Sequence, residues 1–286
     1  MIRLGGDLDI GGETDPDRLA AMHTEFGYTA AYGPYVPVSD TAYIRSYRKA
    51  FAAKDIVIAE VGIWKNMIAP EDDIRKANFE YACERFALAE EVGALCCINF
   101  IGSVAPGERR GPHPDNLTKY GFELCVDTIR GLIDTVKPTR TKFCLEMMQF
   151  LLPDSPEVYL DIVKAVDRAA FGVHLDPVNI ILTPRDYFNN GNLIRRCFDV
   201  LGPWVVSCHA KDITLVDRLA LHMDETIPGK GNLDYAVFLS AISELPRDTP
   251  LMLEHLQRGE YAVARDHITT VAKNNGIRLY EATPTH

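Results

Sequence analysis

The chain has 286 residues, of which 47% are hydrophobic and 24% are charged, a composition and length that suit one large α/β domain or two small ones. Its formal net charge of −10 disfavours binding to nucleic acid or to an anionic membrane surface. The seven cysteines are an odd number and most lie within apolar runs, which is typical of buried thiols and argues against a disulfide framework.

Short apolar runs alternate with amphipathic segments along the whole chain. The runs are nearly continuous, as expected of parallel strands covered on both faces. Helix start signals separate them: Asp15-Pro16, Ser155-Pro156 and Thr183-Pro184 each place a capping side chain before a proline. A longer helix is predicted over 74–92 from its apolar spacing. The predicted strands cover 2–10, 29–35, 55–64, 94–102, 142–148, 170–176, 204–212 and 250–256.

Eight strand–helix repeats within this length predict a single (β/α)8 TIM barrel over residues 1–286. A doubly wound open sheet is the competing architecture, but the glycine pairs at 5–6 and 11–12 do not form its phosphate-binding turn. Two connections, 103–116 and 213–232, are longer than a connector needs to be. Because the loops after barrel strands form the active-site face, we expect both to be functional.

Four consecutive predicted strands end in a side chain that can bind a metal: Glu146, Asp176, His209 and Glu254. Taken singly, a glutamate at a strand end is more often a salt-bridged or capping residue, and a lone histidine is as often a satisfied core residue. Each follows an apolar run, however, where an unpaired charge is costly. Their recurrence favours one divalent cation shared by three carboxylates and an imidazole. We expect Mn(II), with Mg(II), Co(II) or Zn(II) as alternatives.

The second half of the chain contains five motifs in this order: LE at 145–146, HLDPVN at 174–179, CHAKD at 208–212, PGKGNLDY at 228–235 and LEH at 253–255. This series resembles that of the xylose-isomerase-like TIM-barrel superfamily of sugar isomerases and epimerases, to which D-tagatose 3-epimerase and inosose dehydratase belong. The resemblance spans nearly the whole chain, although only the second half carries specific motifs. It implies that Glu146, Asp176, His209 and Glu254 are the metal ligands, and that Glu146 and Glu254 are also the catalytic acid/base pair.

Two carboxylates beside a metal suit proton transfer next to a ketone. The metal would polarise the carbonyl group and stabilise the enediolate formed when an adjacent C–H proton is lost. Return of the proton to the opposite face gives epimerisation, return to the neighbouring carbon gives aldose–ketose isomerisation, and departure of a hydroxyl gives dehydration. We therefore predict a metal-dependent isomerase or epimerase of a ketose or keto-polyol. The alternatives are a lyase (a dehydratase of a keto-inositol or keto-acid, or a cleaver of a 3-keto-glycoside) and a non-catalytic sugar-binding barrel.

Substrate contacts are predicted for Lys211, Trp64, His174 and Asn179. Lys211 lies two residues beyond His209, so both point inward on a continuing strand, with a lysine at the barrel rim as an equal alternative. Trp64 would form a wall for a sugar ring, or simply pack. His174, two residues before the aspartate ligand, is expected one layer deeper as a hydrogen-bonding partner. Asn179 stands where the compared epimerases have a substrate-contacting histidine.

The expected partner is a small carbohydrate, bound by a homodimer or homotetramer because related barrels pack their helical faces together. The AP-endonuclease branch needs extra histidines for a three-metal cluster, and Asn99, Phe100 and Asn179 leave that cluster incomplete. We therefore expect no nucleic-acid partner. No signal peptide and no apolar run of membrane-spanning length occur, so we expect a cytoplasmic protein without membrane contact.

Overall fold

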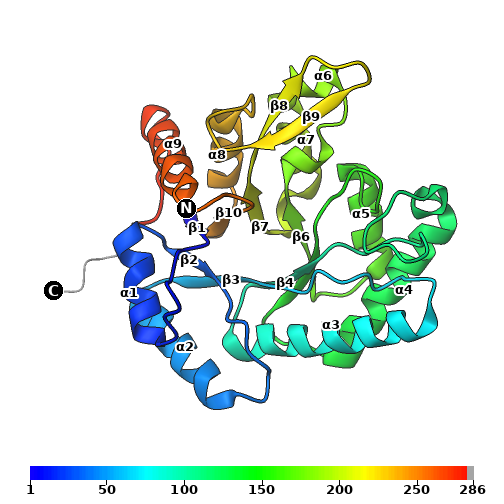
Figure 1. The fold of residues 1–286 in the computed structure, drawn as a ribbon, viewed down its shortest axis with the longest axis horizontal. Helices are drawn as coiled ribbons and strands as arrows, with labels where there is room; N and C mark the ends of the chain where they lie inside the picture. Colours follow the sequence, from blue (N-terminus) through cyan, green and yellow to red (C-terminus); the bar gives the residue numbers. More distant parts are fainter. Residues whose placement is uncertain (282–286) are drawn as a thin grey trace.

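Eight parallel strands close into a barrel with helices around it in the computed structural model, which describes residues 1–281 (Figure 1). Neighbours around the barrel follow the chain, and the first strand pairs with the last along their whole length. This arrangement confirms the predicted single (β/α)8 barrel. The barrel strands are β1 (Ile2–Gly6), β2 (Ala30–Tyr32), β3 (Val57–Gly62), β4 (Cys96–Asn99), β5 (Lys142–Leu145), β6 (Phe171–Leu175), β7 (Val205–Ala210) and β10 (Thr249–Leu253).

The helices begin where the sequence signals place them. Asp15 and Ser155 cap their helices by accepting a hydrogen bond from the backbone three residues on, and a proline follows each. No helix within residues 1–281 combines the length and the apolar character needed to cross a bilayer. The helices are α1 (Pro16–Phe26), α2 (Thr41–Ala53), α3 (Asp72–Val92), α4 (Lys119–Val136), α5 (Pro156–Val166), α6 (Pro184–Tyr187), α7 (Asn190–Leu201), α8 (Tyr235–Ser243) and α9 (Glu260–Asn274), with 3₁₀ turns η1 (Pro114–Leu117), η2 (Pro177–Ile180) and η3 (Gly202–Trp204).

Most of the apolar core lies between the barrel and its helices. The helices bury one stripe each, such as Phe86 and Leu88 on α3 and Phe238 on α8. Six of the seven cysteines are buried, all seven are free thiols, and Cys83 is half-buried. The predicted interpretation of the cysteines as small buried hydrophobes is therefore confirmed for six of them.

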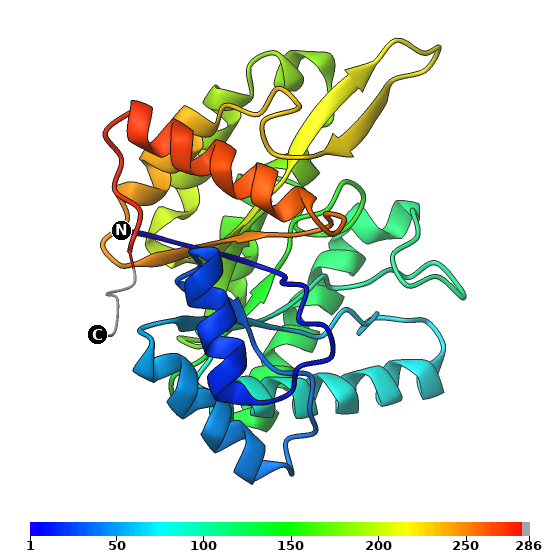
Figure 2. The ribbon, with the colours of Figure 1, turned by 60° about the vertical axis from the view of Figure 1, so that its left-hand side comes forward.

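The connection 213–232 is not the irregular loop that its length predicts. Strand β7 ends at Ala210, and after Lys211 the chain forms an antiparallel hairpin of β8 (Asp212–Val216) and β9 (His222–Thr226) that projects from the barrel (Figure 2). The buried Asp212 carboxylate fixes the base of the hairpin by accepting backbone hydrogen bonds at 2.8–3.0 Å from residues 213, 229, 231 and 233. The amides of Gly229 and Gly231 thus donate to Asp212, and that of Lys230 donates to the Ile227 carbonyl.

Candidate metal centre and substrate cavity

The four predicted metal ligands meet at the carboxyl end of the barrel. Glu146, Asp176 and Glu254 directly follow β5, β6 and β10, and His209 lies in β7. All four are buried, and one ligand atom from each lies within 4.8 Å of the others. The structure thus brings together side chains that are more than a hundred residues apart in the sequence, at the edge where TIM barrels carry their active sites.

His209 is the electrostatic centre of this cluster. Its Nδ1 atom lies 3.1 Å from Glu146 Oε1 and 2.9 Å from Glu254 Oε1. Burial opposes the charged imidazolium, but the surrounding carboxylates, with Glu254 and Glu60 foremost, raise the pKa of His209 well above its usual value. Burial likewise opposes ionisation of Glu146 and Glu254, yet hydrogen bonding and positive charge from His209, together with the Lys211 ammonium, hold the pKa of both below its usual value.

The Lys211 ammonium lies among the three carboxylates. Its Nζ atom is 2.8 Å from Asp176 Oδ2, 2.5 Å from Glu254 Oε1 and 3.7 Å from Glu146 Oε1. Burial nevertheless raises the pKa of Asp176 to about 7. Among residues 1–281, Asp176 Oδ2 and Glu254 Oε1 are buried oxygens that accept no hydrogen bond of good geometry. Asp176 Oδ2 and Glu254 Oε1 are therefore held by the Lys211 ammonium through ion pairs and not through well-aligned hydrogen bonds. A buried, oxygen-rich donor set that holds a positive charge in this way fits a divalent cation.

The contacts of Lys211 lead to a first prediction. The Lys211→Met substitution should lower the free energy of unfolding of the metal-free protein by about 3 kcal/mol, because it leaves buried carboxylates without their cation. Addition of Mn(II) should restore most of this loss, since the metal replaces the missing positive charge. Urea unfolding with and without Mn(II) measures both effects. A Lys230→Met variant, which changes an exposed lysine of the Gly229–Gly231 turn, is the matched control.

A cavity of about 430 Å³ opens onto Glu146 and Glu254. Trp64, one of the predicted substrate contacts, lines it beside Phe100, with the two ring centroids 6.1 Å apart. Gly62 is required here, since a Cβ at this position would lie 2.2 Å from the Trp64 indole nitrogen. Aromatic rings and carboxylates therefore line this cavity, together with the arginines Arg85, Arg109 and Arg110. A larger hollow of about 630 Å³ lies outside the barrel between α7 and α8 and contains none of the four candidate ligands.

Two other predicted substrate contacts, Lys211 and Asn179, line an adjoining cavity of about 250 Å³. The Asn179 amide donates a weak hydrogen bond to Met148 Sδ at 3.8 Å. Arg110 and His255 line both cavities and so lie between them. His174 is placed differently: it is fully buried, and its Nδ1 atom lies 2.7 Å from Ser207 Oγ. The predicted substrate contact of His174 stays a prediction, and its observed partners are protein groups.

Sequence reasoning missed several residues of this site. Alternation along a strand would turn His255 away from Glu254, so no sequence pattern indicates that it belongs to the site; in the structure its Nε2 atom lies 3.7 Å from Glu254 Oε2. The strand has already ended at Leu253, and His255 has a φ of 57°, so alternation no longer applies. Glu60, the only charged residue in the apolar run of β3, was also missed.

Asn99 has a structural role next to the site. Its side-chain oxygen accepts a hydrogen bond from the Lys65 backbone at 3.0 Å, and its amide donates to the Lys65 carbonyl at 2.9 Å. Its own backbone carbonyl accepts from the Glu146 amide at 2.8 Å. Asn99 thereby ties the segment that carries Trp64 to the start of the loop that carries Glu146.

A parallel barrel with a buried cluster of carboxylates and imidazole at its carboxyl end is typical of a metal-dependent enzyme. Residues 21–273 match the xylose isomerase-like TIM barrel family. The chain belongs to this family, as the resemblance of its motifs indicates. No curated protein sequence matches the chain.

Solved structures share the fold at low sequence identity. D-Psicose 3-epimerase from Clostridium cellulolyticum, in complex with D-tagatose, superposes with a TM-score of 0.65 at 15% identity over 96% of this chain and 98% of that one. For 3-keto-D-glucoside 4-epimerase from E. coli, the TM-score is 0.68 at 12% identity over 96% and 100%. For endonuclease IV from Thermus thermophilus, it is 0.69 at 11% identity over 95% and 99%. These similarities establish the fold, and the chemistry must be argued from the site.

Proposed function

We propose that the chain is a divalent-metal-dependent isomerase or epimerase of a ketose or keto-polyol. The observation that carries the proposal is the pair Glu146 and Glu254, which meet at His209 and both line the 430 Å³ cavity. The names of two structural relatives, a psicose epimerase and a keto-glucoside epimerase, agree with this class of substrate. We propose Mn(II) as the native metal, with Glu146, Asp176, His209 and Glu254 as its ligands.

In the proposed reaction one glutamate carboxylate removes the proton from the carbon next to the substrate ketone. The C–H electron pair becomes the double bond of an enediolate, and the ketone oxygen takes the negative charge. The other glutamate must carry a proton at this stage, against the low pKa that His209 and Lys211 give it, and delivers that proton to the opposite face of the same carbon, which gives the epimer. A divalent cation at the site supplies positive charge that polarises the ketone. Trp64 and Phe100, which line the cavity, exclude water from one side of the bound substrate.

The rival proposal is a lyase on the same scaffold, which removes the same proton but expels a β-hydroxyl or β-alkoxy group. Asn179, which lines the adjoining 250 Å³ cavity, favours this rival, because it is a neutral amide at a position where the compared epimerases have a histidine. Asn179 cannot return a proton as an acid. A sugar-binding barrel without turnover is the third candidate, and two buried carboxylates at the cavity argue against it.

The test is proton exchange in heavy water. Metal-loaded protein is incubated in D₂O with D-fructose, D-psicose, D-tagatose and a 3-keto-glucoside, and NMR follows each C–H signal. We expect deuterium to enter next to the ketone of at least one substrate, together with an isomer of unchanged composition. A conjugated enone absorbance would support the lyase, and tight binding without exchange would support the sugar-binding barrel. Either result contradicts the isomerase proposal.

A further inference from the structure

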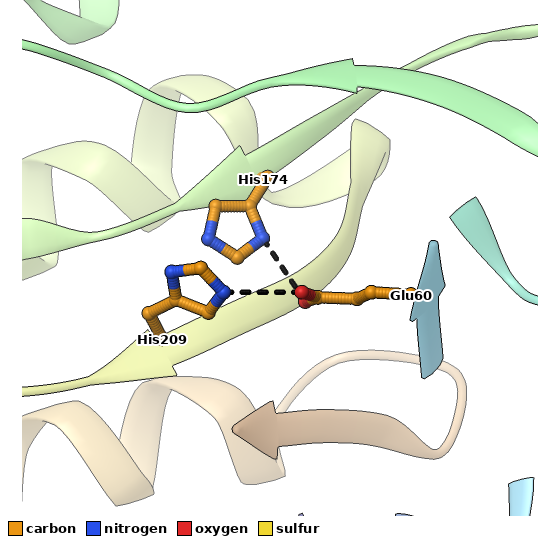
Figure 3. Close-up of side chains that lie close together, drawn as sticks. All are labelled: Glu60, His174 and His209. Carbon is orange, nitrogen blue, oxygen red and sulfur yellow. Dashed lines mark hydrogen bonds and ion pairs between the residues drawn. The ribbon is translucent and has the colours of Figure 1, made fainter. Parts of the chain in front are cut away.

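Glu60 reaches across the barrel to the candidate metal centre and lines the 430 Å³ cavity together with Glu146 and Glu254. It is buried in β3, and its Oε2 atom lies 3.0 Å from His209 Nε2 (Figure 3). Strands β3 and β7 are four positions apart in the ring of eight, so they lie on opposite sides of the barrel. A buried carboxylate costs several kcal/mol unless its partners compensate it. The position of Glu60 therefore requires a reason beyond packing.

The two nitrogens of His209 face different groups. Nδ1 faces the oxygens of Glu146 and Glu254 at 3.1 and 2.9 Å, whereas Nε2 faces only Glu60 among the hydrogen-bond partners in residues 1–281. A histidine ligand must offer a lone pair to its metal, and its other nitrogen then carries the proton. The carboxylate at Nε2 selects the tautomer whose lone pair is on Nδ1, because only a protonated Nε2 can donate to it.

His174 fixes Glu60 from the side. Its Nδ1 atom lies 3.3 Å from Glu60 Oε1, and its ring meets that of His209 edge-on with centroids 4.0 Å apart (Figure 3). The same Nδ1 atom lies 2.7 Å from Ser207 Oγ. All these side chains are fully buried, so none can turn towards solvent. His174 thus lies in contact with Glu60, Ser207 and the ring of His209, although Glu60 Oε1 itself accepts no hydrogen bond of good geometry.

We propose that Glu60 is a positioning residue of the metal centre: it accepts the Nε2 proton of His209 and so holds the Nδ1 lone pair towards Glu146 and Glu254. This proposal rests on the metal site of the proposed function. Its rival is a second metal held by Glu60, His174 and His209, whose ligand atoms also lie within 4.8 Å of one another. That arrangement would require His209 to bind one cation through each nitrogen, with no proton left on the ring.

Metal affinity tests the proposal without relying on turnover. Titration calorimetry with Mn(II) and with Zn(II) compares wild type, Glu60→Ala and Glu60→Gln. We expect Glu60→Ala to weaken binding about 10–100-fold, the usual effect of removing the partner behind a metal-bound histidine. Glu60→Gln keeps an acceptor oxygen at the same distance and should bind close to wild type. Phe238→Leu, a buried change in α8 away from the site, should lower thermal stability without changing metal affinity.

The tautomer of His209 is the second readout. In ¹⁵N-histidine-labelled, Zn(II)-loaded protein, NMR should find the His209 proton on Nε2 in wild type and in Glu60→Gln. The signal is assigned by its absence in His209→Ala. Unchanged affinity in Glu60→Ala, or a proton on Nδ1 in wild type, would overturn the proposal. Two metals per wild-type chain, with one lost in Glu60→Ala, would overturn it in favour of the rival. No metal in wild type would instead defeat the proposed function itself.

Discussion

Glu146→Gln and Glu254→Gln should each lower kcat about 10²- to 10⁴-fold while the protein stays folded. An amide keeps the size and one oxygen of the carboxylate but cannot accept or return a proton at neutral pH, so the loss falls on the proton-transfer step. Because the amide is also a weaker ligand, the rates are compared at saturating Mn(II). Initial rates on whichever ketose shows deuterium exchange give the measurement.

The control for these two variants is Glu123→Gln. Glu123 is an exposed carboxylate on α4 that pairs with Lys119 at 3.5 Å, away from the cavity. Its kcat should equal that of wild type. Wild-type rates in either Glu146→Gln or Glu254→Gln would refute the assignment of that residue as an acid/base catalyst.

Mn(II) should stabilise the chelator-treated protein against heat, and Asp176→Ala and His209→Ala should abolish the effect. A metal present at about a hundredfold its Kd adds about 2.7 kcal/mol to the free energy of unfolding. For a domain of this size the corresponding rise in Tm is about 5–10 °C. Both substitutions remove a ligand from the cluster, so the metal no longer binds the folded state selectively. Differential scanning calorimetry with and without Mn(II) measures the shift.

The same experiment has a pH dependence of defined sign. The carboxylates raise the pKa of His209 well above its usual value in the metal-free protein, and a metal must displace that proton to reach Nδ1. Protons therefore compete with the metal, and the Mn(II)-dependent rise in Tm should be smaller at pH 6 than at pH 8. A shift in Asp176→Ala equal to that of wild type, or a wild-type shift that decreases between pH 6 and pH 8, would contradict the assigned ligands.

The fold was largely predictable because each barrel strand is a short apolar run with its own boundary signals. The ligands were predictable for a related reason: Glu146, Asp176 and Glu254 each stand directly after such a run, where the chain leaves the core. The β8–β9 hairpin was not predicted, since its strands carry charged and polar residues and owe their position to the carboxylate of Asp212.

The contacts of Glu60 and Lys211 could not be predicted from the sequence. Glu60 contacts His209 across the barrel, and no local pattern reports a contact between opposite strands. For Lys211 the sequence predicts an inward side chain or a lysine at the barrel rim, but not its contact at 2.8 Å with Asp176, which follows the neighbouring strand β6. The sequence therefore identifies residues that can form the site, but the contacts between them are known only from the three-dimensional structure.

The most direct test of the central claim is the metal content of gently purified protein, measured by elemental mass spectrometry. The proposed centre predicts about one Mn, Mg, Co or Zn per chain in wild type, and a loss of that metal in both Asp176→Ala and His209→Ala. If wild type contains no metal and gains no thermal stability from any added divalent cation, the proposed metal centre and the proposed reaction are both contradicted. The assignment of the barrel fold is unaffected.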